Sequence, residues 1–164
     1  GAQYIAECIV EKHRFTEQFE GMRNKMQAYE EKHGEKLKIF LCNMGPIPQH
    51  KPRADFSTGF LEVGGFEVLK NDGFSLPQEA AAAAVESKAL AAVICSTDAT
   101  YPELVPDIAR RIKAQNPAMI VMLAGAPAPE YEESYREAGV AEFIHVRANC
   151  LQILTWLQTQ GGIE

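Results

Sequence analysis

The sequence predicts an α/β domain with a doubly wound, five-stranded parallel sheet, preceded by a helical linker. Two observations lead to this prediction. Five short apolar runs recur along the chain, and stretches with helical periodicity lie between them, joined by short links. Strict alternation of strand and helix implies parallel strands, because a helix makes each return crossing and helices then cover both faces of the sheet.

The first predicted element is a helix that begins at Phe15 and ends at Gly34. Its apolar residues are spaced by three and four positions, which places them on one helical face. They are Phe19, Met22, Met26 and Tyr29. Because the rest of the surface is charged, we interpret residues 1–35 as a linker from an absent upstream domain. We expect its apolar stripe to be buried on the sheet domain or on another part.

The five apolar runs are predicted as strands, and each is followed by a helix. The runs are LKIFLC at 37–42, FEVL at 66–69, LAAVIC at 90–95, AMIVML at 118–123 and EFIHV at 142–146. The helices are expected at 54–63, after a capping box of Ser75 and Gln78, after a second box of Thr100 and Glu103, before Gly139, and after Asn149. Five such units in residues 36–164 predict a flavodoxin-like sheet of order 2-1-3-4-5.

The composition of the chain argues against several classes of function. A chain of 164 residues that is 46% hydrophobic suits one domain, and its net charge of −6 argues against binding nucleic acid through the phosphates. No apolar run approaches the ~20 residues that span a membrane. The four cysteines lie far apart without a CxxC pair, as expected for reduced thiols in a cytoplasmic protein. They are Cys8, Cys42, Cys95 and Cys150.

The fold class indicates where a ligand would bind. In open parallel sheets, ligands bind at the carboxyl ends of the strands, where the strand order reverses. The loops predicted there are 43–53, 95–100 and 124–129. The first loop belongs to the stretch GPIPQHKPRADFSTGF at 45–60, which holds His50, and it is longer than most links between a strand and a helix.

Two protein families that share this sheet need site residues that the sequence lacks. A phosphorylation receiver needs carboxylates after the first strand and an aspartate at the end of the third. This chain has Asn43 and Met44, then Cys95 and Ser96. A flavodoxin needs a phosphate loop rich in Ser, Thr and Gly, but NMGPIPQHKP contains three prolines, which supply no amide hydrogen.

The chain resembles the cobalamin-binding domain family in the stretches STGFLEVGGFEV and ELVP. That family's signature is Asp-x-His-x-x-Gly after the first strand, Ser-x-Leu after the third and Gly-Gly after the fourth. The resemblance places His50 on the histidine that coordinates cobalt. Pro48 then holds the place of the aspartate that orients it, Arg53 holds the place of the glycine, and the loop from Gly45 to His50 is one residue longer.

The other two signature stretches also depart from the family. Cys95 and Thr97 replace the serine and leucine, and Ala124 replaces one glycine of the pair, which leaves Gly125. Pro48 cannot accept the imidazole hydrogen, so we expect His50 to be an unoriented ligand. We interpret the whole set as a vestigial pocket that binds no cofactor or metal. It comprises His50, Arg53, Cys95, Ser96, Thr97, Ala124 and Gly125.

GPIPQHKPRADFSTGF and ICSTDATYP resemble the small (beta) subunits of heterodimeric methylmalonyl-CoA mutases. The resemblance implies a non-catalytic, cytoplasmic assembly domain without catalytic residues. Its partner would be the large subunit, which binds adenosylcobalamin and interconverts methylmalonyl-CoA and succinyl-CoA. The alternative is a working cobalamin-binding domain of a mutase-type isomerase, with His50 as the cobalt ligand.

For several of these residues, a purely structural role is an alternative to the functional interpretation. His50 would then be a solvated loop residue, and Cys95 a small apolar residue that ends a buried strand. Alternatively, Arg53 could activate the Cys95 thiol, or Arg53 and Asp55 could pair across a partner interface. Asp55 is expected near the start of its helix. Three histidines lack ligand spacing and are expected to be structural: His13, His33 and His145.

Overall fold

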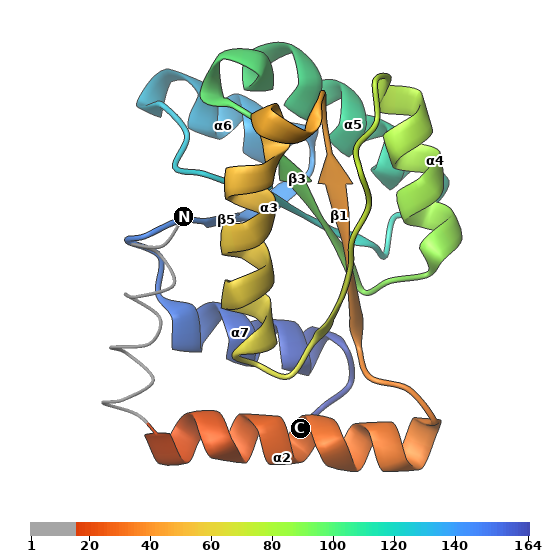
Figure 1. Cartoon of the computed structure of the whole chain (residues 1–164), viewed down its shortest axis with the longest axis vertical. Coiled ribbons are helices and arrows are strands. Elements are labelled where there is room, and N and C mark those ends of the chain that lie inside the picture. Colours follow the sequence, from red (N-terminus) through yellow and green to blue (C-terminus); the bar gives the residue numbers. More distant parts are fainter. Residues whose placement is uncertain (1–15) are drawn as a thin grey trace.

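The computed structural model describes residues 16–164 and contains one parallel sheet of five strands. The strand order is β2-β1-β3-β4-β5, which confirms the predicted fold class (Figure 1). The strands are β1 (Lys38–Asn43), β2 (Glu67–Leu69), β3 (Ala91–Cys95), β4 (Ile120–Ala124) and β5 (Val140–Ile144). The order reverses between β1 and β3, so the chain winds outward from that point in both directions.

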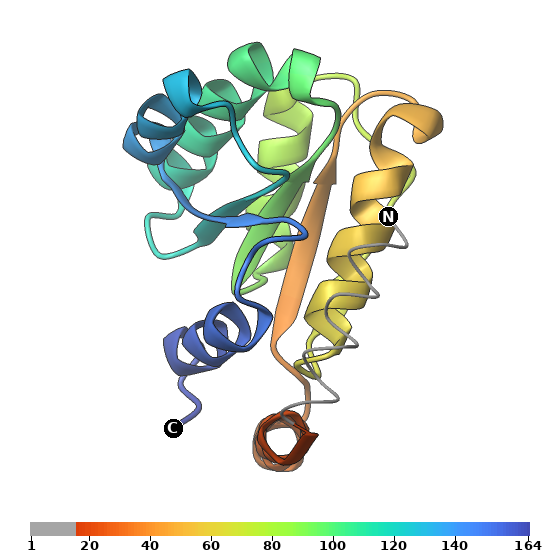
Figure 2. The ribbon, with the colours of Figure 1, turned by 90° about the vertical axis from the view of Figure 1, so that its left-hand side faces the viewer.

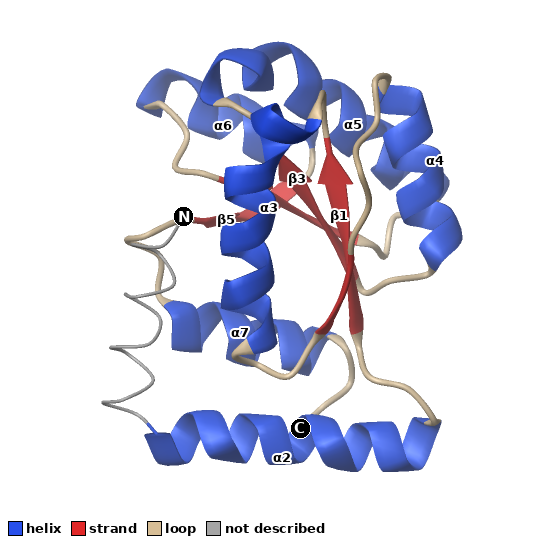
Figure 3. Ribbon diagram, viewed as in Figure 1, coloured by secondary structure: helices blue, strands red, loops and turns tan. Residues whose placement is uncertain are grey.

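Helices cover both faces of the sheet (Figures 2 and 3). They are α2 (Thr16–His33), α3 (Ile47–Glu62), α4 (Pro77–Ser87), α5 (Tyr101–Gln115), α6 (Pro129–Ala138) and α7 (Cys150–Gln160), with a short 3₁₀ helix η1 (Asp98–Thr100). Buried residues of α2, α3 and α7 form one core, and those of α4, α5 and α6 form the other. Among these helices, none is long and apolar enough to cross a membrane.

The two cores meet the sheet through alternate residues of its strands. In β1, Ile39 and Leu41 belong to the core under α3, whereas Phe40 and Cys42 belong to the core under α4 and α5. Successive side chains of a strand point to opposite faces, so a strand covered on both sides is apolar throughout. This explains why β1, β3 and β4 appear in the sequence as continuous apolar runs.

Helix α2 packs on the sheet domain through its apolar stripe. Phe19, Met22 and Met26 are buried in the same core as residues of α3 and α7. Gln158 of α7 donates hydrogen bonds from Nε2 to the carbonyl oxygen of Met22 at 2.9 Å and to that of Gly64 at 3.2 Å. Burial of the stripe is therefore confirmed. Phe15 lies outside the described residues, and the assignment of 1–35 as a linker remains a prediction.

Helix α3 begins at Ile47, so the prediction of a loop at 43–53 and a helix at 54–63 is wrong. The link that follows β1 is only residues 44–46. Prolines are tolerated here because the first turn of a helix has amide groups without intrahelical partners, so Pro48 costs no hydrogen bond. Asp55 consequently lies within the helix, where it pairs with Lys51 at 2.9 Å.

The predicted helix ends were partly correct. Helix α4 is capped by Leu76 and helix α5 by Thr100, in neither case through a side chain, so both capping boxes are wrong. Asn149 caps α7 as predicted, because its Oδ1 accepts a hydrogen bond from the amide of Gln152 at 2.9 Å. Strand β5 begins at Val140 rather than Glu142, and the register of β4 and β5 shifts at this point.

Candidate functional site

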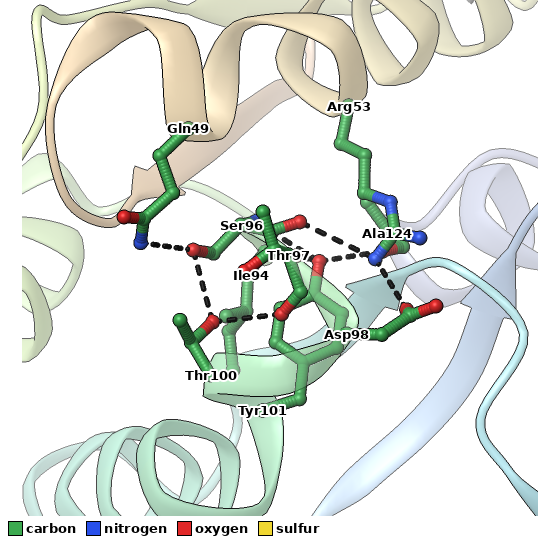
Figure 4. A network of polar contacts seen from close by, with 9 residues as sticks. All are labelled: Gln49, Arg53, Ile94, Ser96, Thr97, Asp98, Thr100, Tyr101 and Ala124. Carbon is green, nitrogen blue, oxygen red and sulfur yellow. Dashed lines mark hydrogen bonds and ion pairs between the residues drawn. The ribbon is translucent and has the colours of Figure 1, made fainter.

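The carboxyl ends of β1, β3 and β4 bring together most of the residues that the sequence singled out. Figure 4 shows Arg53 reaching from α3 towards Ser96 and Thr97, which follow β3, and towards Ala124 at the end of β4. This is the crevice at which the strand order reverses, the usual ligand position in open parallel sheets.

Arg53 is the central side chain of this crevice. Its Nη1 lies 2.7 Å from Oδ1 of Asp98 and donates to the carbonyl oxygen of Ser96 at 3.3 Å. The guanidinium also lies over the ring of Tyr101, 5.3 Å from its centroid. Burial opposes the charge of Arg53, but its contacts with Asp98 and Tyr101 outweigh burial and raise its pKa. The cation is therefore held inside the crevice by its own chain.

Gly125 lies directly beneath this guanidinium. A Cβ atom on Gly125 would lie 2.8 Å from Nη1 of Arg53, and the φ angle of 130° also disfavours any other residue. The space above Gly125 is therefore filled by Arg53.

Tyr101 joins the ends of two neighbouring strands. Its hydroxyl accepts a hydrogen bond from the amide of Ser96 at 2.9 Å and donates one to the carbonyl oxygen of Ala124 at 2.6 Å. Only 2% of the residue is exposed, and burial raises the pKa of the phenol. The tyrosine is thus a neutral structural bridge between the segments after β3 and β4.

Ser96 is the centre of a second set of polar contacts. Its hydroxyl accepts a hydrogen bond from Nε2 of Gln49 at 2.8 Å and lies 3.3 Å from the carbonyl oxygen of Met44. The hydroxyl of Thr100 lies 3.0 Å from Oγ of Ser96 and 2.7 Å from the carbonyl oxygen of Thr97. These contacts fix the segment after β3 against the start of α3 (Figure 4).

His50 is buried in α3, with 3% of its surface exposed, so its interpretation as a solvated loop residue is wrong. Its Nδ1 lies 3.0 Å from the carbonyl oxygen of Gly45. Because a carbonyl only accepts, Nδ1 carries a proton and donates it to Gly45. The expectation of an unoriented imidazole is also wrong, since the Gly45 carbonyl takes the orienting role that Pro48 cannot take.

Cys95 ends β3 as a fully buried residue, which confirms its apolar structural role. Burial raises the pKa of its thiol to about 12, although the hydrogen bond between this thiol and Ser57 and the charge of Arg53 act in the opposite direction. The interpretation as a reactive thiol is therefore wrong, because the thiolate is the reactive species.

Three residues of the crevice were not singled out from the sequence: Gln49, Asp98 and Tyr101. Asp98 and Tyr101 lie in the quoted stretch ICSTDATYP, where an acidic and an aromatic residue follow a strand end. Among the histidines expected to be structural, His33 lies against the ring of Tyr29, at 4.1 Å between centroids, and Nδ1 of His145 accepts from the amide of Arg147. His13 lies outside the described residues.

Comparison with known proteins identifies relatives over most of the chain. The small subunit of methylmalonyl-CoA mutase from Streptomyces virginiae is 35% identical over 92% of this chain. The small subunit from Porphyromonas gingivalis is 28% identical over 92%, and a probable small subunit from Mycobacterium tuberculosis is 29% identical over 91%. The chain is homologous to a segment of methylmalonyl-CoA mutase small subunits. It spans about a quarter of the length of these relatives, 23% to 24%.

More distant relatives and solved structures agree with the fold. The human mitochondrial methylmalonyl-CoA mutase is 26% identical over 71% of this chain and 16% of its own length. A cobalamin-binding protein from Desulfitobacterium hafniense superposes with a TM-score of 0.60 at 13% identity, covering 94% of this chain and 77% of its own. A CheY-like protein from Pseudomonas aeruginosa gives 0.59 at 16% identity, covering 78% and 95%. No protein-family model matches the chain.

Proposed function

We propose that this chain is a non-catalytic assembly domain in the small subunit of a heterodimeric methylmalonyl-CoA mutase. Its partner is the large subunit, which binds adenosylcobalamin and interconverts methylmalonyl-CoA and succinyl-CoA. The widely spaced cysteines, of which Cys42 and Cys95 are buried thiols, support a cytoplasmic assembly. The homology to small subunits supports membership of the complex, and the crevice at the strand reversal supports the non-catalytic role.

The observation that carries the proposal is the position of Arg53. Its guanidinium fills the space above Gly125 and is held there by Asp98, Tyr101 and the carbonyl of Ser96. A macrocycle in this crevice would have to displace the Arg53 guanidinium from its ion pair with Asp98 and from the ring of the buried Tyr101. As they stand, these residues do not fit a bound corrin, and we assign no chemical step in this chain to that cofactor.

Titration of the purified chain with hydroxocobalamin and adenosylcobalamin tests the degenerate site. We expect no saturable change in the corrin absorption spectrum at micromolar concentration, and no isomerisation of methylmalonyl-CoA by the chain with adenosylcobalamin added. A saturable change that is lost in His50→Ala would overturn the assignment of a vestigial pocket. Glu62→Ala, at an exposed position near the end of α3, is the matched control.

Association with the large subunit tests the assembly role separately. The intact small subunit should co-purify with its large subunit, and substitutions on the exposed surface of this domain should lower the yield of the complex without lowering the melting temperature of the free chain. A complex whose yield and activity are unchanged when the whole domain is deleted would exclude an assembly role.

A second candidate function is a working cobalamin-binding domain with His50 as the cobalt ligand. One observation favours it: the Gly45 carbonyl fixes the proton on Nδ1 of His50, and metal-bound imidazoles in proteins are held by such partners. The same titration separates the two functions, because histidine coordination changes the cobalamin spectrum and requires the His50 side chain.

A further inference from the structure

We propose that the carboxyl end of the sheet is the surface through which this domain docks on the large subunit, and that the large subunit meets it with an apolar centre and a basic rim. The proposal rests on the assembly role proposed above. It starts from Ile47, Leu76 and Tyr131, which we call the apolar triplet. They are the large hydrophobic residues that are exposed among residues 16–164, at 47%, 44% and 38%.

All three residues of the apolar triplet lie where a helix begins. Ile47 is the first residue of α3, Leu76 precedes the first residue of α4, and Tyr131 is in the first turn of α6. Because each of these helices follows a parallel strand, they begin at the carboxyl edge of the sheet, the upper end of Figure 1. The amide of Gly45 donates to the carbonyl oxygen of Phe74 at 2.9 Å, so the start of α3 lies beside the segment before α4.

The links between strands and helices at this end add no charge to the apolar triplet. Residues 44–46, 96–97 and 125–128, which follow β1, β3 and β4, contain no charged side chain. Small apolar residues of these links and of the helix starts are also exposed, namely Pro46, Pro48, Ala99, Ala126 and Ala128. An exposed apolar area with polar residues around it is typical of a protein–protein interface.

Acidic residues share this end of the sheet with the apolar triplet. The first turns of α4, α5 and α6 and the 3₁₀ helix η1 each contain an exposed acidic residue: Glu79, Glu103, Glu130 and Asp98. None of these turns contains a lysine or an arginine. A basic rim on the partner complements this charge, whereas a second copy of the same surface would present like charges and be repelled.

The assembly role needs a surface whose burial can hold the large subunit, because a few large side chains at the centre of an interface supply most of the binding free energy. In the described part of the chain, large apolar residues are exposed only at this end. Helix α2 packs at the opposite end of the sheet and leaves the apolar triplet uncovered (Figures 1 and 2). The acidic residues would repel nucleic acids and anionic membranes. The large subunit is therefore the occupant that these observations favour.

The double variant Ile47→Ser/Leu76→Ser of the intact small subunit tests the apolar triplet. Its dissociation constant for the large subunit should rise at least about tenfold, because two large side chains are removed from the interface. The melting temperature of the free small subunit should not fall, because both residues are exposed and serine is favoured where a helix begins. Lys36→Ser/Glu62→Ser is the matched control. It changes two exposed residues away from this end, keeps the net charge, and should leave the dissociation constant unchanged.

Ionic strength tests the basic rim of the partner. The rate constant for association of the two intact subunits should fall several-fold between low salt and about 0.5 M salt, because salt screens the attraction between exposed charges. The triple variant Glu79→Gln/Glu103→Gln/Glu130→Gln should associate more slowly at low salt and depend less on salt. An association rate that is independent of salt and of these three substitutions would contradict the basic rim.

The outcomes separate this proposal from the assembly role. If the intact subunits associate and the double variant associates equally tightly, the assembly role stands and the docking surface is wrong. A double variant that lowers the melting temperature of the free small subunit, with unchanged affinity for the large subunit, would place the surface inside the small subunit and overturn the proposal. Dimers of the small subunit that the double variant abolishes would show that a second copy is the occupant. Intact subunits that do not associate would overturn both proposals.

Discussion

The polar residues of the crevice differ in how much their contacts contribute to stability. The side chain of Asp98 is 71% exposed and that of Arg53 is 28% exposed, so solvent screens their ion pair and it stabilises the fold by less than about 1 kcal/mol. The hydroxyl of Tyr101 is buried and satisfies the amide of Ser96 and the carbonyl of Ala124. The hydrogen bonds of the neutral Tyr101 hydroxyl therefore contribute more to the stability of the fold than the ion pair between Arg53 and Asp98.

Tyr101→Phe should lower the free energy of unfolding by about 1–3 kcal/mol, because the amide of Ser96 and the carbonyl of Ala124 would lose a buried partner. Urea denaturation at neutral pH measures the change. Tyr131→Phe is the control, since Tyr131 is 38% exposed, and its free energy of unfolding should stay within about 0.5 kcal/mol of that of the unsubstituted chain. Equal effects of the two substitutions would contradict the bridging role.

The buried thiol of Cys95 makes stability depend on alkaline pH. Burial raises its pKa from an ordinary 9.0 to about 12, so above pH 9 the unfolded chain releases a proton that the folded chain keeps. Stability is then complete below pH 9 and falls as the pH rises towards 12, by at most about 1.4 kcal/mol per pH unit for this group.

Unfolding free energies measured across this range should decline less steeply in Cys95→Ala than in the unsubstituted chain. Burial raises the pKa values of Cys42 and Tyr101 as well, so part of the decline should remain. Identical slopes for the two chains would mean that Cys95 ionises as readily in the folded protein as in the unfolded one.

At the scale of elements, the sequence was sufficient for the sheet and insufficient for α3. Apolar runs at regular spacing predicted all five strands, and the signal is clearest for β1, β3 and β4, which are buried on both faces. The predicted strand order followed from the fold class that this alternation indicates, and it is confirmed. The start of α3 was missed because three prolines between 46 and 52 indicate a loop, yet Pro46 and Pro48 lie at and just after the helix start. The Arg53–Asp98 pair joins segments far apart in sequence, and no local pattern predicts it.

Helix α2 shows how one element depends on packing rather than on its own propensity. Phe19 is completely buried in the core shared with α7, whereas its neighbours Gln18 and Glu20 are exposed. Phe19→Ala should lower the free energy of unfolding by about 3–5 kcal/mol, as large-to-small changes in a core do. Glu20→Ala should change it by less than about 0.5 kcal/mol. A small effect of Phe19→Ala in thermal or urea unfolding would mean that α2 is not docked in solution.

At the scale of the whole molecule, the sheet separates two cores, but α2 does not add a third. Its buried residues belong to the core that also contains Ile39 and Leu41 of β1 and Leu154 and Leu157 of α7. Gln158 of α7 ties α2 to the domain, because its Nε2 donates both to the carbonyl oxygen of Met22 in α2 and to that of Gly64 after α3. Because α2 shares its core with the central strands, it cannot detach from the sheet domain without exposing apolar residues of those strands to water.

We therefore expect residues 16–164 to unfold in one cooperative transition, with α2 and the sheet losing structure together. Trp156 is the only tryptophan of the chain and lies on α7 against this core, so its fluorescence reports on the part of the molecule where α2 docks. Far-ultraviolet circular dichroism reports on all helices and strands. The two signals should give the same midpoint in urea, and Phe19→Ala should shift both midpoints equally. A fluorescence midpoint well below that of circular dichroism would show that α2 undocks before the sheet unfolds.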